Sequence, residues 1–278
     1  MAIVTFWSNG KEETAKTLSL AAIATHMAIE HNYKILILST VFNDNTLETC
    51  YWEPRNQELL KEIAGNKKDI ASGIDGLVKI ALSNKLTPET VTNYTRLVFP
   101  GNRLEVLLGS NAESYQEYEK VRQTYKDVIQ VANQFYDYVF VDLNKGLDND
   151  YIREILELSD LIVVNITQRL KLIRDFEQLK ENDEIFKKDN IMLLVGRYDK
   201  YSKYNSKNIA RSLGYKGEVS VVPYSTLFFE ACNEGKVADF FLRFRKLNPT
   251  DRNALFIEEI KKATDAMLER IRLIGNRR

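Results

Sequence analysis

Short apolar runs alternate along the chain with longer stretches whose apolar positions recur every three or four residues. This alternation is typical of parallel strands joined by crossover helices. Several runs are continuously aliphatic or β-branched, as expected of strands covered on both faces. The predicted strands are Ile3–Phe6, Ile35–Leu38, Glu105–Leu108, Tyr138–Val141, Leu161–Asn165, Ile191–Val195 and Val219–Val222. The predicted helices are Thr14–His31, Glu113–Phe135, Asp150–Leu158, Lys171–Lys180 and Ser206–Leu213.

The pattern predicts an α/β fold with a mostly parallel central sheet of about seven or eight strands and helices on both faces. Residues 53–96 are polar, and glycines and a proline interrupt their helical spacing. We interpret them as a helical excursion between strands. Because no internal repeat or low-complexity linker divides the sequence, we expect one domain over residues 1–250 and a C-terminal helix over 251–278.

The end of the chain predicts an amphipathic helix that packs on the domain or extends it. Its apolar residues recur at helical spacing within Asn253–Ile274: Phe256, Ile257, Ile260, Met267, Leu268, Ile271 and Ile274. Residues 236–278 carry 11 Lys and Arg against 6 Asp and Glu, a local excess of five positive charges (11 − 6). The simplest interpretation is a solvated helix face; contact with a membrane, DNA or a partner is the alternative.

The charge balance and the apolar runs of the chain limit the classes of protein to which it can belong. Lys plus Arg and Asp plus Glu number 39 each, so no global field recruits nucleic acid or anionic lipid. The N-terminus lacks a signal-peptide pattern, and no apolar run approaches the roughly 20 residues that cross a bilayer. We therefore expect a soluble cytoplasmic protein, with peripheral contact at the inner face of the membrane as the alternative.

The sequence contains only two His and two Cys residues, which argues against a metal centre built on these side chains. Cys50 and Cys232 lack the close spacing of a zinc site, and we expect both as reduced, buried thiols. His26 and His31 are the only histidines, and we expect both at the surface of the first predicted helix.

A segment with the spacing of a phosphate-binding loop lies between the first strand and that helix. The spacing is G-x-x-x-x-G-K-[ST], and residues 10–17 read GKEETAKT, with Ala15 in place of the second glycine. In such a loop, backbone N–H groups and the helix N-terminus bind phosphate oxygens. Lys16 would bridge the terminal phosphates and Thr17 would hold Mg²⁺.

An acid at the end of a buried strand would complete a nucleotide site. The stretch YDYVFVDLNKG, residues 136–146, contains an apolar strand followed by Asp142 and a loop that closes on Gly146. A carboxylate at the carboxyl end of a strand can hold Mg²⁺ through water, as a Walker B acid does.

With these two motifs in order, the sequence resembles the ParA/MinD family of P-loop ATPases, whose loop reads G-K-G-G-x-G-K-T. Lys11 occupies the place of the family's signature lysine. The resemblance covers most of the chain except residues 54–96 and the C-terminal tail. It is carried by NYKILILSTVFNDNTLE (32–48), RLEVLLGSN (103–111), SDLIVVNITQRLKLIRDFEQL (159–179), IMLLVGRYDKYS (191–202) and VVPYSTLFFEACNEGKV (221–237).

The resemblance implies a P-loop NTPase that uses ATP and Mg²⁺ and dimerises with ATP at the interface. Lys11 and Lys16 would be its catalytic residues, with Lys11 reaching the partner's phosphate, and Thr17 and Asp142 would hold the metal. The implied nucleotide contacts are Gly10, Lys11, Thr14, Ala15, Lys16, Thr17, Leu18, Arg197 and Pro223.

The loop departs from the family pattern at three glycines, which are Glu12, Glu13 and Ala15 here. A side chain at a position that needs positive φ costs about 1–2 kcal/mol. Each carboxylate at about 4 Å from a phosphate would add roughly 4 kcal/mol of repulsion at an effective dielectric of 20, or about 1 kcal/mol if solvated. In a purely structural interpretation, Asn9 or Gly10 makes the turn and both glutamates lie in the first helical turn, where they favour the helix dipole.

Two further departures lie outside the loop. The family's acids after the second strand, which position Mg²⁺ and the attacking water, correspond to Ser39 and Val41; Asp44 is near but out of register. The family's adenine-reading Asn corresponds to Gly196, which precedes Arg197.

These features predict a ParA/MinD-like regulatory protein that dimerises and spatially organises a partner machinery, with slow or absent ATP hydrolysis. If active, it would be a weak Mg²⁺-dependent ATPase; if the glutamates close the site, it would be a pseudo-ATPase scaffold. Branches with eroded loops include pilus-localisation proteins of the TadZ/CpaE type, so a pilus or secretion system is the favoured partner. The alternatives are a DNA-binding partition ATPase and a metabolic P-loop enzyme of the same superfamily.

Overall fold

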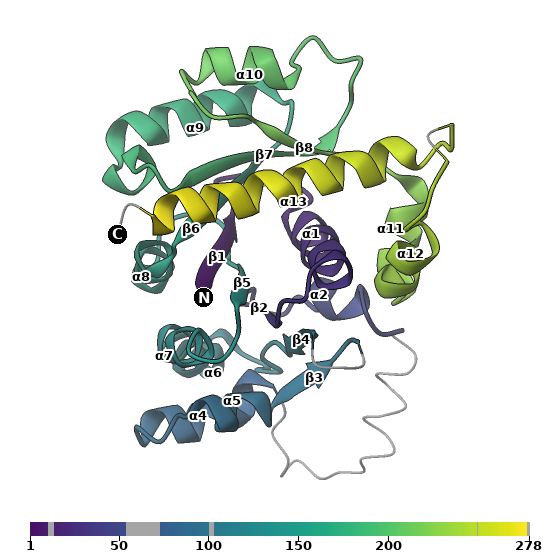
Figure 1. Cartoon of the computed structure of the whole chain (residues 1–278). Coiled ribbons are helices and arrows are strands. Elements are labelled where there is room, and N and C mark those ends of the chain that lie inside the picture. Colours follow the sequence, from purple (N-terminus) through teal and green to yellow (C-terminus); the bar gives the residue numbers. More distant parts are fainter. Residues whose placement is uncertain (11–13, 54–72, 100–102, 249, 277–278) are drawn as a thin grey trace.

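A single eight-stranded sheet organises the chain (Figure 1). The computed structural model describes residues 1–10, 14–53, 73–99, 103–248 and 250–276. The strand order is β3-β4-β2-β5-β1-β6-β7-β8, and every pairing is parallel except that of β3 with β4. The strands are β1 (Ala2–Trp7), β2 (Ile35–Ser39), β3 (Thr95–Leu97), β4 (Leu104–Leu107), β5 (Tyr138–Asp142), β6 (Leu161–Ile166), β7 (Ile191–Tyr198) and β8 (Ser220–Pro223).

Helices cover both faces of the sheet, as predicted. One face is covered by α4 (Ile74–Leu82), α5 (Pro88–Thr92), α6 (Tyr115–Arg122), α7 (Tyr125–Ala132), α8 (Asp150–Leu158), α9 (Leu170–Asn182), the 3₁₀ turn η1 (Glu184–Lys187) and α10 (Ser206–Ser212). The other face is covered by α1 (Lys16–Glu30), α2 (Thr46–Thr49), α11 (Thr226–Asn233), α12 (Val237–Arg243) and α13 (Ala254–Gly275). Each face has its own apolar core, so the central strands are buried on both sides.

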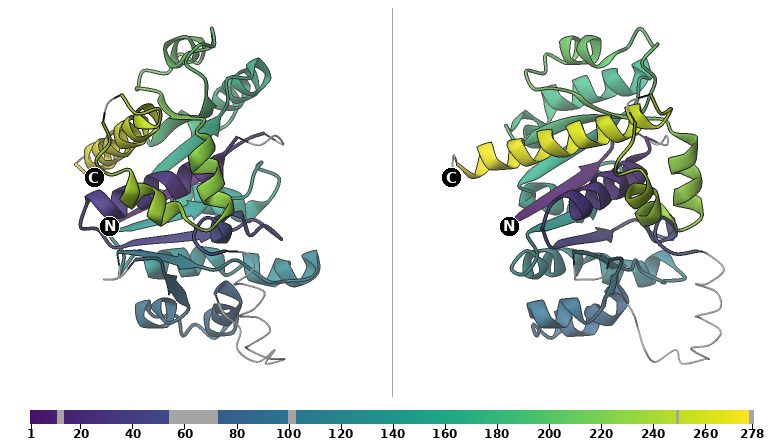
Figure 2. Two further views of the ribbon diagram at one scale, coloured as in Figure 1. Left: turned by 90° about the vertical axis from the view of Figure 1, so that its right-hand side faces the viewer. Right: turned by 45° about the vertical axis from the view of Figure 1, so that its right-hand side comes forward.

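The C-terminal helix α13 lies beside α1 on the same side of the sheet (Figures 1 and 2). Its residues Phe256, Ile260 and Met267 are fully buried against α1 and β8 in that core. The other predicted apolar positions, Ile257, Leu268, Ile271 and Ile274, pack partly buried at its edge. The apolar stripe of α13 is therefore used within the chain, which leaves its charged residues toward solvent.

Two predictions of secondary structure are wrong in detail. The predicted excursion over 53–96 ends in β3, an antiparallel edge strand of three residues that is too short to show a periodicity. Within its described part it forms α4 and α5. The single helix predicted over 113–135 is two helices, because the backbone N–H and the hydroxyl of Thr124 both bond the carbonyl of Val121 and tighten the chain into a turn.

The prediction that both histidines lie at the surface is wrong for His26, which is 7% exposed. The reason is that α1 is enclosed between the sheet and the helices α12 and α13. The His26 ring lies edge-on to Phe241, and its Nδ1 is 3.3 Å from the hydroxyl of Thr264. His31, at the end of α1, is half-buried.

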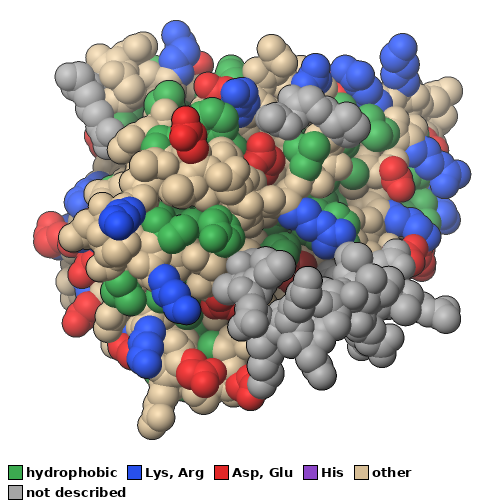
Figure 3. Space-filling view, turned by 90° about the horizontal axis from the view of Figure 1, so that it is seen from below, with side chains coloured by type: hydrophobic (Ala, Val, Ile, Leu, Met, Phe, Trp, Pro, Cys, Tyr) green, Lys and Arg blue, Asp and Glu red, His purple; other side chains and the backbone are tan. Residues whose placement is uncertain are grey.

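Surface charge is mixed. The face seen in Figure 3 carries side chains of both signs, Lys and Arg as well as Asp and Glu, in agreement with the zero net charge of the sequence. Among the described residues, no helix is both long and apolar enough to cross a membrane.

Candidate functional site

The described end of the loop between β1 and α1 agrees with the predicted spacing at one position, Ala15. Ala15 precedes α1 with φ 56° and ψ 30°, in the left-handed region that favours glycine. Its carbonyl accepts the Ser19 backbone N–H at 2.8 Å and so begins the helix. Retaining Ala there costs about 1–2 kcal/mol relative to an unstrained residue. Lys11, Glu12 and Glu13 lie outside the described residues.

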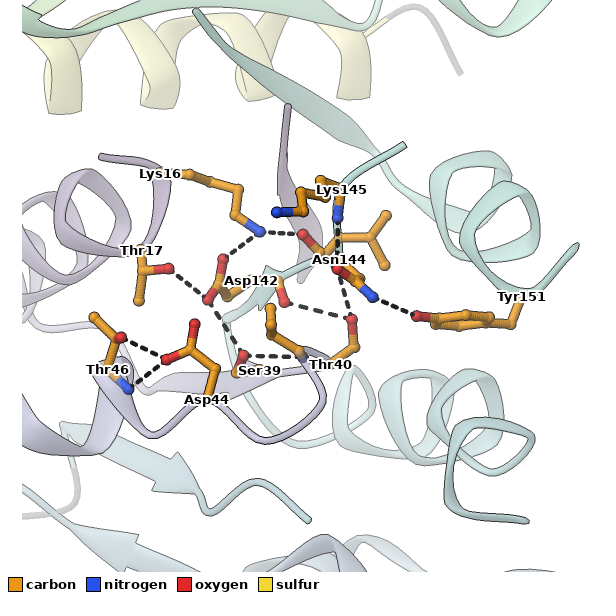
Figure 4. Close-up of polar contacts among 12 residues, drawn as sticks. Lys16, Thr17, Ser39, Thr40, Asp44, Thr46, Asp142, Asn144, Lys145 and Tyr151 are labelled. Atoms are coloured by element: carbon orange, nitrogen blue, oxygen red, sulfur yellow. Dashed lines mark hydrogen bonds and ion pairs between the residues drawn. The ribbon is translucent and has the colours of Figure 1, made fainter. Parts of the chain in front are cut away.

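Three predicted residues meet at the carboxyl end of the sheet (Figure 4). The ammonium of Lys16 lies 2.8 Å from Asp142 Oδ1, and the hydroxyl of Thr17 donates to Asp142 Oδ2 at 2.8 Å. Lys16 also donates to the carbonyl of Leu143. Asp142 is 1% exposed, so its charge is balanced by these contacts rather than by water.

The end of β2 supplies a further donor to the same carboxylate. β2 and β5 pair in parallel with Ser39 opposite Asp142, and the Ser39 hydroxyl donates to Asp142 Oδ2 at 3.2 Å. Thr17, Ser39 and Asp142 thus form a cluster of hard oxygen atoms of the kind that Mg²⁺ prefers. These residues fit a Mg²⁺ ion held by Thr17 and, through water, by Asp142. Among the described residues there is no group of three or more His, Cys, Asp or Glu side chains that could hold a metal alone.

A cavity of about 370 Å³ opens over this cluster. Its walls come from the β1–α1 loop, the segment after β2, the loop after β5, the end of β7 and the helix α11. The predicted nucleotide-contact residues that line it are Gly10, Thr14, Ala15, Lys16, Thr17, Leu18 and Arg197. Pro223, at the end of β8, lines a neighbouring cavity with Tyr224 and Arg252 instead.

Gly196 has a steric reason to lack a side chain. A Cβ at this position would lie 2.1 Å from the carbonyl oxygen of Thr14, which is impossible without moving the loop. The β7–β8 pairing is irregular between Val195 and Tyr198, and Arg197 has φ 51°. The end of β7 is therefore irregular where it meets the pocket, which Arg197 lines.

The segment after β2 brings one apolar and one acidic side chain to the pocket. Val41 and Asp44 both line it. The Asp44 carboxylate accepts the backbone N–H of Thr46 at 2.8 Å, an Asx turn that starts α2. Val41 has no polar group that could orient a water molecule, so Asp44 is the acid of this segment that faces the cavity.

Several residues that line the pocket were not predicted from the sequence. Lys145, in the loop after β5, points its ammonium toward that of Lys16 (Figure 4). Phe229, Cys232 and Asn233 line the cavity from α11. A lysine in an exposed loop and one turn of an amphipathic helix carry no periodic signal, so only the spatial arrangement could identify them.

The two thiols are free and buried, as predicted, and they lie against each other. Burial raises the pKa of the Cys232 thiol, and its hydrogen bond with Cys50 raises the pKa further. The Cys232 thiol is therefore neutral near pH 7. The contact between Cys50, at the end of α2, and Cys232, in α11, holds these two helices together beside the pocket.

No family model matches the sequence, and no curated protein matches it. Solved structures do match the fold. A ParA family ATPase from Chlorobium tepidum has a TM-score of 0.69 and 18% identity, over 94% of this chain and 98% of that one. The septum site-determining protein MinD from Pyrococcus horikoshii, complexed with Mg-ADP, has a TM-score of 0.63 and 16% identity, over 95% and 96%.

A MinC:MinD cell division complex from Aquifex aeolicus also matches, with a TM-score of 0.65 and 16% identity over 95% of both chains. Each of these matches spans almost the whole length of both chains. The chain therefore has the fold of ParA/MinD-family P-loop ATPases, and the predicted α/β fold class is confirmed.

Proposed function

We propose that this protein is a ParA/MinD-type nucleotide switch that binds ATP with Mg²⁺. The observation that carries the proposal is the meeting of Lys16 and Thr17 on the buried carboxylate of Asp142, beneath a 370 Å³ cavity. A lysine, a hydroxyl and an acid in this order form the phosphate and metal site of a P-loop NTPase. The similar structure of MinD with Mg-ADP supports the choice of ligand.

The arrangement also indicates what must move when a nucleotide binds. Lys16 is engaged by Asp142 and by the Leu143 carbonyl, so its ammonium has to leave both to reach a phosphate. A nucleotide compensates by offering Lys16 several phosphate oxygens. When bound, Mg²⁺ would neutralise negative charge on the phosphates, and it would replace Lys16 as the positive charge next to the Asp142 carboxylate. Lys16 would thus exchange one anionic partner for another, and Thr17 and Asp142 are the residues that would hold the ion.

Hydrolysis is expected to be slow or absent. A general base or a water-orienting group must lie within hydrogen-bond reach of the attacking water. Val41 offers neither, and the Asp44 carboxylate, although it faces the cavity, is held through Oδ1 by Thr46 at the start of α2. At most the protein is a weak Mg²⁺-dependent ATPase, in which nucleotide binding rather than hydrolysis determines the state of the switch.

A nucleotide switch of this kind acts through its partners. We propose a homodimer that binds nucleotide at its interface and positions a protein partner, with a pilus or secretion apparatus as the favoured machinery. The MinC:MinD complex supports the general idea that this fold presents a surface to a partner protein. The eroded loop at Glu12, Glu13 and Ala15 supports the branch in which the dimer acts as a scaffold.

The deciding measurement is ATP binding by calorimetry, with and without Mg²⁺, on the wild type, Lys16→Ala and Lys207→Ala. Lys207 is an exposed residue of α10 outside the pocket, so its variant controls for the loss of one positive charge. We expect binding in the wild type and in Lys207→Ala and its loss in Lys16→Ala. Undetectable binding in all three would overturn the nucleotide switch.

A further inference from the structure

We propose that Lys145 is a second phosphate-binding lysine of the pocket, supplied by the loop after β5 and specific for nucleoside di- and triphosphates. The proposal rests on the nucleotide switch argued above and names a residue that the motif spacing does not include. It accounts for how a loop with Glu12 and Glu13 in place of glycines can still attract a polyphosphate.

One side of the Lys145 loop is fixed to β1. The backbone N–H of Gly146 donates to the carbonyl of Ser8 at 3.3 Å, and the indole N–H of Trp7 donates to the carbonyl of Gly146 at 2.8 Å. Gly146 has φ 78°, a conformation that side chains rarely adopt. The turn after Lys145 is therefore held in register with the start of the phosphate-binding loop.

The other side of the loop is fixed to the segment after β2. The backbone N–H of Asn144 donates to the Thr40 hydroxyl at 3.0 Å, and its side-chain amide donates to the Tyr151 hydroxyl at 3.4 Å. The side-chain oxygen of Asn144 in turn accepts the backbone N–H of Lys145 at 2.8 Å. Lys145 thus extends from a backbone that is anchored before and after it, whereas a lysine that serves only solubility needs no such support.

The charges around Lys145 indicate an anionic ligand. Its ammonium points toward that of Lys16 (Figure 4), and both residues line the cavity. In the described part of the chain its ammonium has no ion-pair partner, because the nearby Asp142 carboxylate is engaged by Lys16, Thr17 and Ser39. Two converging ammonium groups repel each other, and an anion between them removes that cost.

The position of Lys16 indicates which phosphates Lys145 would contact. Lys16 comes from the start of α1 and Lys145 from the loop after β5, so they face the cavity from different elements. The lysine of a phosphate-binding loop reaches the β- and γ-phosphates of a nucleotide. An ammonium that converges on Lys16 therefore acts on these same phosphates, which AMP lacks, and this ties Lys145 to the polyphosphate rather than to the nucleoside.

The test compares ATP, ADP and AMP binding by calorimetry for the wild type, Lys145→Met, Lys145→Arg and Lys207→Met. Lys145→Met keeps the length of the side chain and removes its charge. Because a charge-assisted hydrogen bond is lost, we expect about tenfold weaker ATP and ADP binding and a smaller change for AMP. Lys145→Arg should retain most of the affinity, and Lys207→Met should equal the wild type.

The outcomes separate this proposal from the one on which it rests. ATP binding by Lys145→Met equal to that of the wild type would overturn the role of Lys145 and leave the nucleotide switch standing. An equal loss for AMP and ATP would also overturn it, because the lysine would then not act on the additional phosphates. Undetectable nucleotide binding by the wild type would overturn both. Thermal unfolding of each variant verifies that the fold is kept.

Discussion

Gly196 lies directly against the backbone of Thr14, so that a Cβ at position 196 would approach the Thr14 carbonyl oxygen to 2.1 Å. This contact joins the end of β7 to the phosphate-binding loop just before the strained Ala15. It follows that the absence of a side chain at position 196 and the position of Thr14 are one structural feature. The loop can keep its place only because β7 contributes no side chain there.

Gly196→Ala is therefore expected to displace the loop. The new methyl group must push Thr14 away, which disturbs Ala15 and the N-terminus of α1, and overpacking of this kind costs about 1–3 kcal/mol. We expect ATP binding to weaken at least about tenfold and the free energy of unfolding to fall. Calorimetry and urea unfolding measure the two effects.

Gly109→Ala is the matched control, since a Cβ there would meet its nearest neighbour, Glu48, at an ordinary 3.6 Å. It should change neither quantity appreciably. If Gly196→Ala behaves like Gly109→Ala, the loop tolerates a side chain at position 196, and the steric account of this glycine is wrong.

Asp142→Asn is expected to separate Mg²⁺ dependence from nucleotide binding. The amide keeps the size of the side chain but removes the charge that could hold the ion, while Lys16 and Thr17 remain available to the phosphates. We expect Mg²⁺ to strengthen ATP binding by the wild type and to have little effect on the variant. Titrations at fixed ATP with increasing Mg²⁺ provide the comparison, and an unchanged Mg²⁺ response in Asp142→Asn would exclude this residue from the metal site.

The elements that could be predicted from the sequence are those with long-range pattern or fixed spacing. The continuous apolar runs predicted the seven parallel strands, and the two motifs predicted the proximity of Lys16, Thr17 and Asp142. The prediction failed where no pattern exists. β3 is too short for a periodicity, and Lys145 resembles any exposed loop lysine until its anchoring contacts are known.

The double variant Glu12→Gly, Glu13→Gly tests the electrostatic cost of the two glutamates to nucleotide binding. Each solvated carboxylate near a phosphate is expected to cost about 1 kcal/mol, so replacing both should tighten ATP binding by roughly tenfold to thirtyfold. Calorimetry at low and high salt measures the gain, which should shrink as salt screens the charges. The control Glu12→Gln, Glu13→Gln removes the charges without restoring glycine and should give most of the gain. No gain in either variant would show that the glutamates do not oppose the nucleotide.

His26 should make the stability of the α1–α13 packing depend on pH. Burial lowers the pKa of His26 below its usual 6.5, although the carboxylates of Glu30 and Asp265 oppose this effect, while His31 and Lys261 add to it. The Thr264 hydroxyl donates to the carbonyl of Ile260, so it accepts from the Nδ1–H of a neutral imidazole. The folded state therefore binds fewer protons than the unfolded state between the lowered pKa and 6.5.

The contribution of His26 is consequently complete above pH 6.5 and is lost as the pH falls below 6.5, by up to about 1.4 kcal/mol per pH unit. Urea unfolding at pH 7.5 and pH 5.5 should show a fall in the free energy of unfolding for the wild type. His26→Gln, which cannot charge, should show a smaller fall, whereas the control His31→Gln, at the half-buried end of α1, should resemble the wild type. An equal fall in the wild type and His26→Gln would assign the pH dependence to groups other than this buried histidine.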